Sequence, residues 1–111
     1  MNNFNDIDYD KVINIIVEEI DPESIILFGS RGRGTNEPDS DLDLLVVDRG
    51  NFSKERSRHS VRNRLRQALS EVRVPKDILL YNNSEVEHWK DYCNHIIHTC
   101  ISEGKVLYAK P

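Results

Sequence analysis

Two short apolar runs constrain the fold of this chain more than any other feature. Residues 24–28 read Ser-Ile-Ile-Leu-Phe and run directly into Gly29, and residues 41–48 alternate acidic and apolar side chains before becoming wholly apolar. Short runs of this kind, rich in branched side chains and bounded by turn residues, predict buried strands. Both are far too short to cross a bilayer as helices.

Three amphipathic segments predict helices around these strands. Apolar side chains recur at helical spacing over about 8–20, 53–72 and 84–103. In the last segment Ser84 can cap the helix, and Glu87 stands at the spacing of a capping box. We expect one continuous helix there.

Two further strands complete the predicted order. Residues 74–81 read as a strand with Pro75 near its start, where proline is tolerated, and residues 106–108 can add a short edge strand. The order helix, strand, strand, helix, strand, helix, strand predicts an α/β (α+β) chain with too few strands for a doubly wound sheet. Without repeats or long linkers, 1–111 is expected to be one domain.

The acidic residues at the start of the second strand form the most informative motif. Asp41 and Asp43 are two apart, so both carboxylates point to one side of the sheet, and Leu42 and Leu44 point to the other. Two carboxylates held together repel each other unless they are protonated or bridged by a cation. Mg²⁺ typically binds one or two carboxylates together with substrate phosphates, and it would resolve this repulsion.

The turn after the first strand supplies a complementary phosphate site. Gly29 lets the backbone approach a ligand closely, and Ser30 offers a hydroxyl and an amide. If the chain turns helical at Arg31, the amides face an anion from a positive dipole end. The side chains of Arg31 and Arg33 can pair with phosphate oxygens. Together with the carboxylates, this predicts phosphoryl or nucleotidyl transfer.

Asp77 is the candidate for a third carboxylate. It lies in the predicted third strand beside Ile78, Leu79 and Leu80. An unpaired buried carboxylate is unfavourable, so we expect a metal shared with Asp41 or Asp43. A carboxylate at the rim of the sheet, paired with a basic side chain, is the alternative.

These residues resemble the nucleotidyltransferase superfamily related to DNA polymerase β, and within it the minimal nucleotidyltransferases. In that family Gly-Ser-Arg-Ala-Arg-Gly leads to Ser-Asp-x-Asp-Leu. This chain has Gly-Ser-Arg-Gly-Arg-Gly at 29–34 and Ser-Asp-Leu-Asp-Leu at 40–44. It departs from the pattern at Gly32, where alanine is usual, a small-for-small change that could loosen the turn but removes no ligand. The segment 103–108 also resembles the end of those small proteins.

The resemblance implies a fold, an activity and a partner. It implies a small mixed β-sheet flanked by helices. Family members often accompany an all-helical HEPN protein, and some are antitoxins that transfer AMP from ATP to a tyrosine of that ribonuclease toxin. Asp41, Asp43 and Asp77 would bind Mg²⁺, two ions by analogy, and act in catalysis, while Gly29 and Ser30 would hold the nucleotide phosphates.

Other functions remain open at this point. A non-catalytic antitoxin of the same fold could neutralise its partner by contact alone, although clustered carboxylates give a pure binder no advantage. Transfer to a small molecule or to RNA is a third reading. The net charge of −4, from 15 basic and 19 acidic residues, indicates no general affinity for nucleic acid or membranes. No signal pattern starts the chain, so we expect it in the cytoplasm.

Two other clusters of side chains stand out in the sequence. A basic stripe, formed by Lys54, Arg58, Arg62 and Arg66 on the second predicted helix, is either a docking surface or an ordinary solvated face. Cys93 and Cys100 lie seven apart in the last predicted helix, beyond disulfide reach, and are expected to be reduced. With the nearby histidines they do not have zinc-site spacing.

Overall fold

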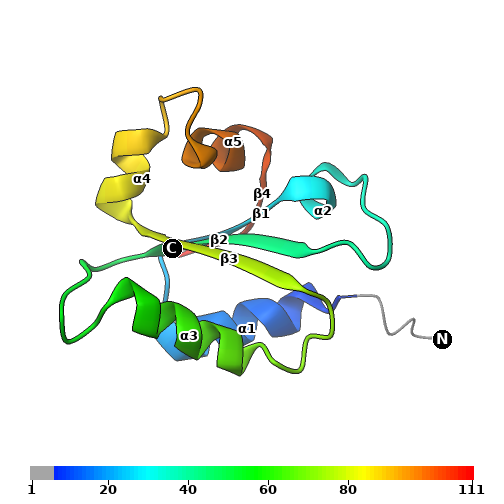
Figure 1. The fold of residues 1–111 in the computed structure, drawn as a ribbon, viewed down its shortest axis with the longest axis horizontal. Helices are drawn as coiled ribbons and strands as arrows, with labels where there is room; N and C mark the ends of the chain where they lie inside the picture. The colour runs from blue at the N-terminus through cyan, green and yellow to red at the C-terminus, as the bar shows by residue number, and fades with distance from the viewer. Residues whose placement is uncertain (1–6) are drawn as a thin grey trace.

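A four-stranded mixed sheet forms the centre of the protein, described here by a computed structural model for residues 7–111 (Figure 1). The strands are β1 (Ser24–Phe28), β2 (Leu42–Asp48), β3 (Lys76–Asn82) and β4 (Lys105–Ala109). Their order across the sheet is β3-β2-β1-β4. β1 is antiparallel to both β2 and β4, and β2 is parallel to β3. The expected α+β fold with a small mixed sheet is confirmed.

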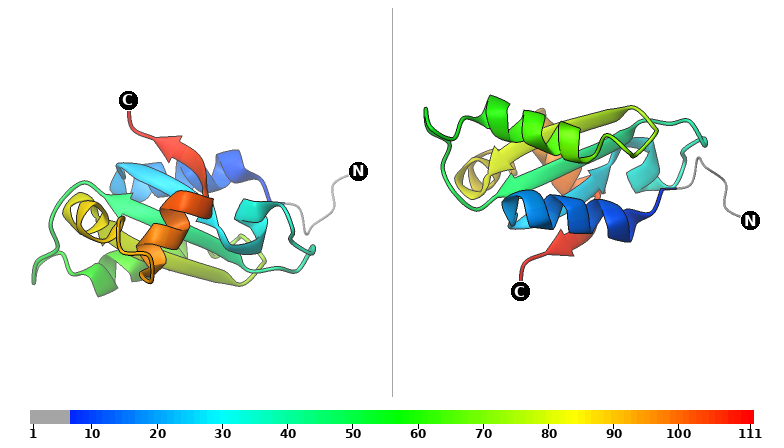
Figure 2. Two further views of the ribbon diagram at one scale, coloured as in Figure 1. Left: turned by 90° about the horizontal axis from the view of Figure 1, so that it is seen from above. Right: turned by 90° about the horizontal axis from the view of Figure 1, so that it is seen from below.

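Helices cover both faces of this sheet. They are α1 (Tyr9–Ile20), α2 (Gly29–Arg33), α3 (Arg58–Ala68), α4 (Asn83–Trp89) and α5 (Ile96–Glu103). α1 and α3 pack on one face, and α4 and α5 lie on the other, as Figures 1 and 2 show from three directions. The short α2 follows β1 directly and contacts α5. Within residues 7–111, no helix is both long and apolar enough to span a membrane.

The alternation of side chains along β2 explains why its sequence is apolar almost throughout. Leu44 and Val46 belong to the hydrophobic cluster that faces α1 and α3. Leu45 and Val47 belong to a second cluster, which includes Ile97 of α5. A strand buried on both faces needs apolar side chains at successive positions, not at every second one.

The helix predicted over 53–72 is shorter in the structure, because its cap is Ser57. The Ser57 hydroxyl accepts a hydrogen bond from the Ser60 amide, and α3 runs only from Arg58 to Ala68. Lys54 therefore lies outside the helix. Arg58 is also not free on its surface, since its guanidinium pairs with Glu85 of α4. The prediction of a four-residue basic stripe on one helix face is thus wrong. Lys54 precedes the helix, and Arg58 forms an ion pair with Glu85 of α4.

The last predicted helix is wrong as a single element. The chain forms α4 and α5 with a link over 90–95, and the cap is Asn82, not Ser84. The Asn82 side chain accepts from the Glu85 amide and the Glu85 carboxylate accepts from the Asn82 amide, each at 2.9 Å. Cys93 lies exposed in the link, whereas Cys100 is buried in α5.

An aromatic contact fixes the link between the two helices. His95 caps α5, its ring Nδ1 accepting from the Ile97 amide at 3.1 Å. The same ring stacks on Trp89 with centroids 4.3 Å apart and planes 10° from parallel. The imidazole therefore begins one helix while packing against the end of the other, which a continuous helix would not allow.

The identity of the α4 cap can be tested by paired substitutions. Replacing Asn82 with alanine removes one partner of a reciprocal capping box, and we expect the free energy of unfolding to fall by about 1 kcal/mol in urea denaturation. Ser84→Ala is the control, because Ser84 lies within the helix and is exposed, and it should change stability by less than about 0.5 kcal/mol. Equal losses in the two variants would contradict this assignment.

Candidate active site

The turn from β1 into α2 brings Gly29 against the carboxylate of Asp43. Phe28 and Asp43 are paired in the β1–β2 ladder, so the next residue reaches the same end of the sheet. Gly29 has φ +68°, and a Cβ built on it would lie 2.1 Å from Asp43 Oδ2. Real side chains cannot approach so closely, and the left-handed backbone is itself unfavourable for non-glycine residues. Glycine is required here for both reasons.

The parallel pairing of β2 and β3 places Asp77 next to Asp43. The two residues are in register, and side chains in register on adjacent strands point to the same face. Asp41 immediately precedes β2 and has the same parity as Asp43. Leu42 and Leu44, which alternate with them, are fully buried on the opposite face, as expected. The three predicted carboxylates thus belong to one end of the sheet, and Asp43 is the one that lies against Gly29.

The charges of these residues act on one another. Burial raises the pKa of Asp43, and the negative charges of Asp77 and Asp41 raise it further. Arg33 is the nearby cation that opposes this rise. Proximity of Arg33 to the carboxylates is consistent with its expected place at the phosphate site. Asp43 is half-buried, whereas Asp41 and Asp77 are exposed.

Ser30 and Arg31 have backbone and side-chain roles in the turn. Ser30 lies in the first turn of α2, and its carbonyl accepts from the Thr35 amide at 2.9 Å. Arg31 is buried, and its guanidinium donates to the carbonyls of Ser40 and Pro38. The sequence suggested that a helix starts at Arg31, and in the structure α2 starts two residues earlier, at Gly29. The sequence placed both arginines at a phosphate, but the structure gives them different surroundings.

The carboxylates have the chemistry of a cation site but are not gathered into one. Within residues 7–111, no three His, Cys, Asp or Glu side chains are grouped closely enough to hold a metal ion as they stand. The oxygen-only donors, and the pKa of Asp43 raised by its acidic neighbours, fit Mg²⁺.

Close packing beneath the turn was not anticipated from the sequence. A Cβ on Gly32 would lie 2.6 Å from the Leu27 carbonyl oxygen and 3.9 Å from Gly104 Cα. Gly32 therefore lets α2 pack tightly against β1 and the start of β4. A Cβ at this position would overlap the Leu27 carbonyl, so the glycine in place of the usual alanine has a packing reason in this chain.

Cys100 lies next to the carboxylates from the helical side. Burial raises the pKa of this thiol to about 12, and the charges of Asp43 and Asp77 contribute to the rise. A thiol with so high a pKa is unreactive at neutral pH. The sequence placed Cys100 on the buried stripe of the last helix, which is correct, but did not associate α5 with the site.

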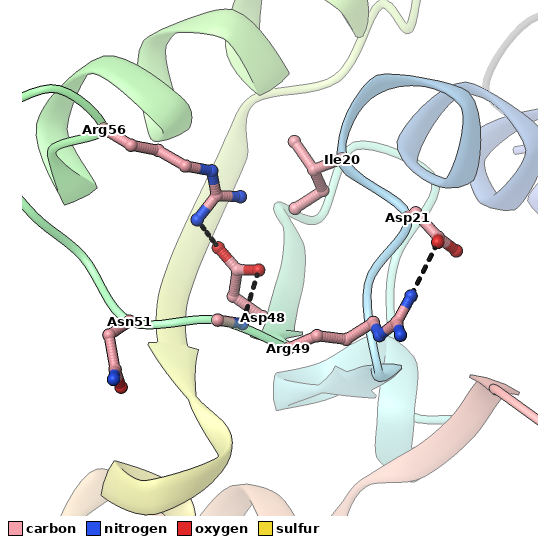
Figure 3. Close-up of a pocket in the computed structure, with 7 residues that line it drawn as sticks. Ile20, Asp21, Asp48, Arg49, Asn51 and Arg56 are labelled. Atoms are coloured by element: carbon pink, nitrogen blue, oxygen red, sulfur yellow. Dashed lines mark hydrogen bonds and ion pairs between the residues drawn. The ribbon is translucent and has the colours of Figure 1, made fainter.

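A separate cavity lies at the opposite end of β2 and does not include these residues (Figure 3). It has a volume of about 380 Å³ between the end of α1 and the loop after β2. Its charges are paired: the buried Asp48 contacts Arg56 at 2.6 Å, and Asp21 contacts Arg49 at 2.8 Å. Because these charged side chains are paired with one another, we assign them a structural role and not a role in ligand binding.

The close approach at Gly29 can be tested against a second glycine of like conformation. Gly34 has φ +75°, and a Cβ there would meet nothing within 4 Å. Alanine at either position suffers the same backbone strain, but only Gly29→Ala collides with Asp43. We expect Gly29→Ala to lose about 1–3 kcal/mol more than Gly34→Ala in urea denaturation. Equal losses would show that the carboxylate does not lie against the turn.

The raised pKa of Asp43 predicts a pH-dependent gain in stability when its charge is removed. The folded protein holds this proton more tightly than the unfolded chain does, so ionisation costs stability as the pH rises above the ordinary carboxyl value of 3.8. Without divalent cations, Asp43→Asn should therefore melt at a higher temperature than wild type at pH 7. The difference should vanish as the pH falls below 3.8. A lower melting temperature at pH 7 would contradict the prediction.

Comparisons with known proteins identify a family and a shared fold. Residues 10–111 match the family model described as polymerase beta, nucleotidyltransferase. No curated protein matches the chain significantly. Among solved structures, a toxin–antitoxin with AMP-PNP is similar, with a TM-score of 0.62 and 21% identity over 94% of this chain and 75% of the other.

Two further structures share the fold. A variant of the toxin–antitoxin MntA-HpeT, carrying two aspartate-to-glutamate substitutions, has a TM-score of 0.59 and 19% identity, over 94% of this chain and 75% of the other. A Sulfolobus solfataricus structure described as a putative nucleotidyltransferase has a TM-score of 0.50 and 20% identity, over 99% of this chain and 91% of the other. Since the family model spans nearly all of the described residues, the chain belongs to the polymerase beta nucleotidyltransferase family.

Proposed function

We propose that this protein is a Mg²⁺-dependent nucleotidyltransferase that transfers AMP from ATP to a tyrosine hydroxyl of a HEPN ribonuclease toxin and thereby acts as its antitoxin. The observation that carries the catalytic part is the Asp43 carboxylate against the turn at Gly29, with Asp77 in register on the neighbouring strand. The partner and the acceptor follow from the resemblance to minimal nucleotidyltransferases.

Each residue of the site has a role in this proposal. Asp41, Asp43 and Asp77 hold Mg²⁺ through carboxylate oxygens, and Gly29 and Ser30 place their backbone against the triphosphate. Bound Mg²⁺ would supply Lewis-acid activation of the acceptor hydroxyl and neutralise charge on the departing pyrophosphate. Arg33, whose charge already acts on Asp43, is placed to offset negative charge when a nucleotide binds.

The proposed reaction balances without any further reactant. The acceptor oxygen forms a bond to the α-phosphorus of ATP, and the bond from that phosphorus to the bridging oxygen breaks. Pyrophosphate leaves, and the hydroxyl proton passes to solvent or to a basic group. No oxidation takes place, so positioning and charge neutralisation provide most of the rate enhancement.

The similar toxin–antitoxin structures support the biological setting. One of them contains AMP-PNP, an adenine nucleotide, and another carries a pair of aspartate substitutions in MntA-HpeT. Their identities to this chain, 21% and 19%, support a common fold. The nucleotide, the HEPN partner and the tyrosine acceptor are parts of the proposal.

A non-catalytic antitoxin is the second candidate. It would bind the toxin and neutralise it without transferring a nucleotide. The electrostatics of Asp43 argue against this reading, because its ionisation is opposed by burial and by Asp77 and Asp41. A module that only binds its partner has no use for carboxylates whose ionisation is unfavourable, whereas a bound cation would stabilise their negative charge. Transfer to RNA or a small molecule is tested by the same assay.

The decisive experiment incubates the protein with Mg²⁺, the HEPN partner and ATP labelled at either the α- or the γ-phosphate. We expect the α-label to join the partner and the γ-label not to, which separates nucleotidyl from phosphoryl transfer. Asp43→Asn and Asp77→Asn should each lower the transfer rate at least about a hundredfold, since a bound metal contributes several kcal/mol to such a transition state.

Asp39→Asn is the matched control, because Asp39 is an exposed carboxylate in the loop between α2 and β2, and its substitution should leave transfer unchanged. Mg²⁺ should also raise the melting temperature of wild type, by preferential binding to the folded state, and not that of Asp43→Asn. Full neutralisation of the toxin by Asp43→Asn without any label transfer would favour the binding module. Label on RNA alone would favour the third reading.

A further inference from the structure

The loop that delivers Asp41 to the site is held by a side chain from α2. Residues 34–40 join α2 to β2, and all of them except the last are exposed. Loop residues of this kind have few packing contacts to fix their backbone. Asp41 is the first residue after the loop, so its position depends on how the loop end is held.

Hydrogen bonds fix the backbone on both sides of Asp41. Arg31 Nε donates to the carbonyl of Ser40 at 3.1 Å, which is the peptide unit that leads into Asp41. On the other side, the Leu42 amide donates to the carbonyl of Pro75 at 2.8 Å. Asp41 therefore lies between two hydrogen-bonded residues. Ser40 before it is held by the side chain of Arg31, and Leu42 after it is held by Pro75, the residue that precedes β3.

Arg31 makes a second hydrogen bond to the loop, and we call the two hydrogen bonds together the Arg31 clamp. This pair of contacts requires a guanidinium. Arg31 Nη2 donates to the carbonyl of Pro38 at 3.0 Å, so one side chain binds two carbonyls of the same loop. A planar guanidinium presents several donors in a fixed fork, whereas a lysine ammonium is a single point. The loop closes further through the Glu37 amide, which donates to Ser40 Oγ at 2.9 Å.

The two arginines of α2 differ in their surroundings. Arg31 is only 9% exposed, and its described hydrogen bonds go to loop carbonyls. Within residues 7–111 no carboxylate forms a salt bridge with it. Arg33 is exposed and near Asp43. One arginine thus faces the loop and the other faces the carboxylates.

We propose that Arg31 is a positioning residue, which holds the loop end so that the Asp41 carboxylate is set beside Asp43 for cation binding. This replaces the expectation that Arg31 binds nucleotide phosphate. The link from Arg31 to cation binding rests on the proposed function. The hydrogen bonds by which Arg31 holds the loop do not depend on that function. Arg31 acts through the backbone before Asp41 and does not contact the substrate.

Amide hydrogen exchange without Mg²⁺ or nucleotide tests the clamp directly. The amides of Ser40 and Leu42 are both hydrogen-bonded in the structure and report on the loop end. In Arg31→Lys we expect them to exchange about tenfold faster, because charge is retained but the two-carbonyl fork is lost. Arg33→Lys is the control for exchange and should leave both amides within about twofold of wild type.

A cation titration tests the purpose of the clamp. In Arg31→Lys, the Mg²⁺ concentration that gives half of the maximal rise in melting temperature should increase about tenfold. At saturating Mg²⁺, the KM for ATP should stay within about twofold of wild type. If Arg31 instead binds the nucleotide phosphates, Arg31→Lys should raise the KM for ATP, and saturating Mg²⁺ should not restore it. This outcome would overturn the proposal.

Ser40→Ala keeps the proposal testable if Arg31→Lys does not fold. It removes the hydroxyl that accepts from the Glu37 amide and loosens the same loop from the other side. The Mg²⁺ requirement should rise in the same direction. Unchanged exchange and an unchanged Mg²⁺ requirement in both variants would refute the clamp. If wild type transfers no nucleotide but the exchange result holds, the proposed function fails and the clamp stands.

Discussion

The contact between the Asp43 carboxylate and the backbone of Gly29 is the constraint on which the rest of the site depends. It exists because β1 and β2 pair antiparallel with Phe28 opposite Asp43, so that the turn after β1 closes over the start of β2. The parallel neighbour β3 then adds Asp77 in register. A carboxylate pressed against a turn and beside other carboxylates is unfavourable alone, and a ligand carrying positive charge relieves it.

Much of the fold could be predicted because its strands are short, apolar and bounded by clear turn signals. β1 was predicted at the observed bounds, and β2 and β3 within two residues at each end. The helices were less predictable, since serine and asparagine caps compete locally. Ser57 caps α3, which begins at Arg58, five residues after the predicted start at 53, and Asn82 caps α4 in place of Ser84. The stacking of His95 on Trp89 is a contact that periodicity cannot reveal.

The site was predictable where it depends on strand geometry and less so where it depends on packing. The period of a strand is enough to align Asp41 with Asp43, but the sequence alone does not reveal the register that brings Asp77 beside them. The role of Arg31 could not be deduced, because a buried and an exposed arginine look alike in a Gly-Arg motif. Only the fold of the loop over 34–40 shows that its guanidinium is directed at backbone carbonyls.

The stacked pair at the junction of α4 and α5 has a spectroscopic consequence. Trp89 is the only tryptophan of the chain, so its emission reports on one place, the ring stack with His95. α5 also carries Cys100, which lies close enough to feel the charges of Asp43 and Asp77. An event at the carboxylates that shifts α5 would therefore change the intrinsic fluorescence, with no dye or label attached to the protein.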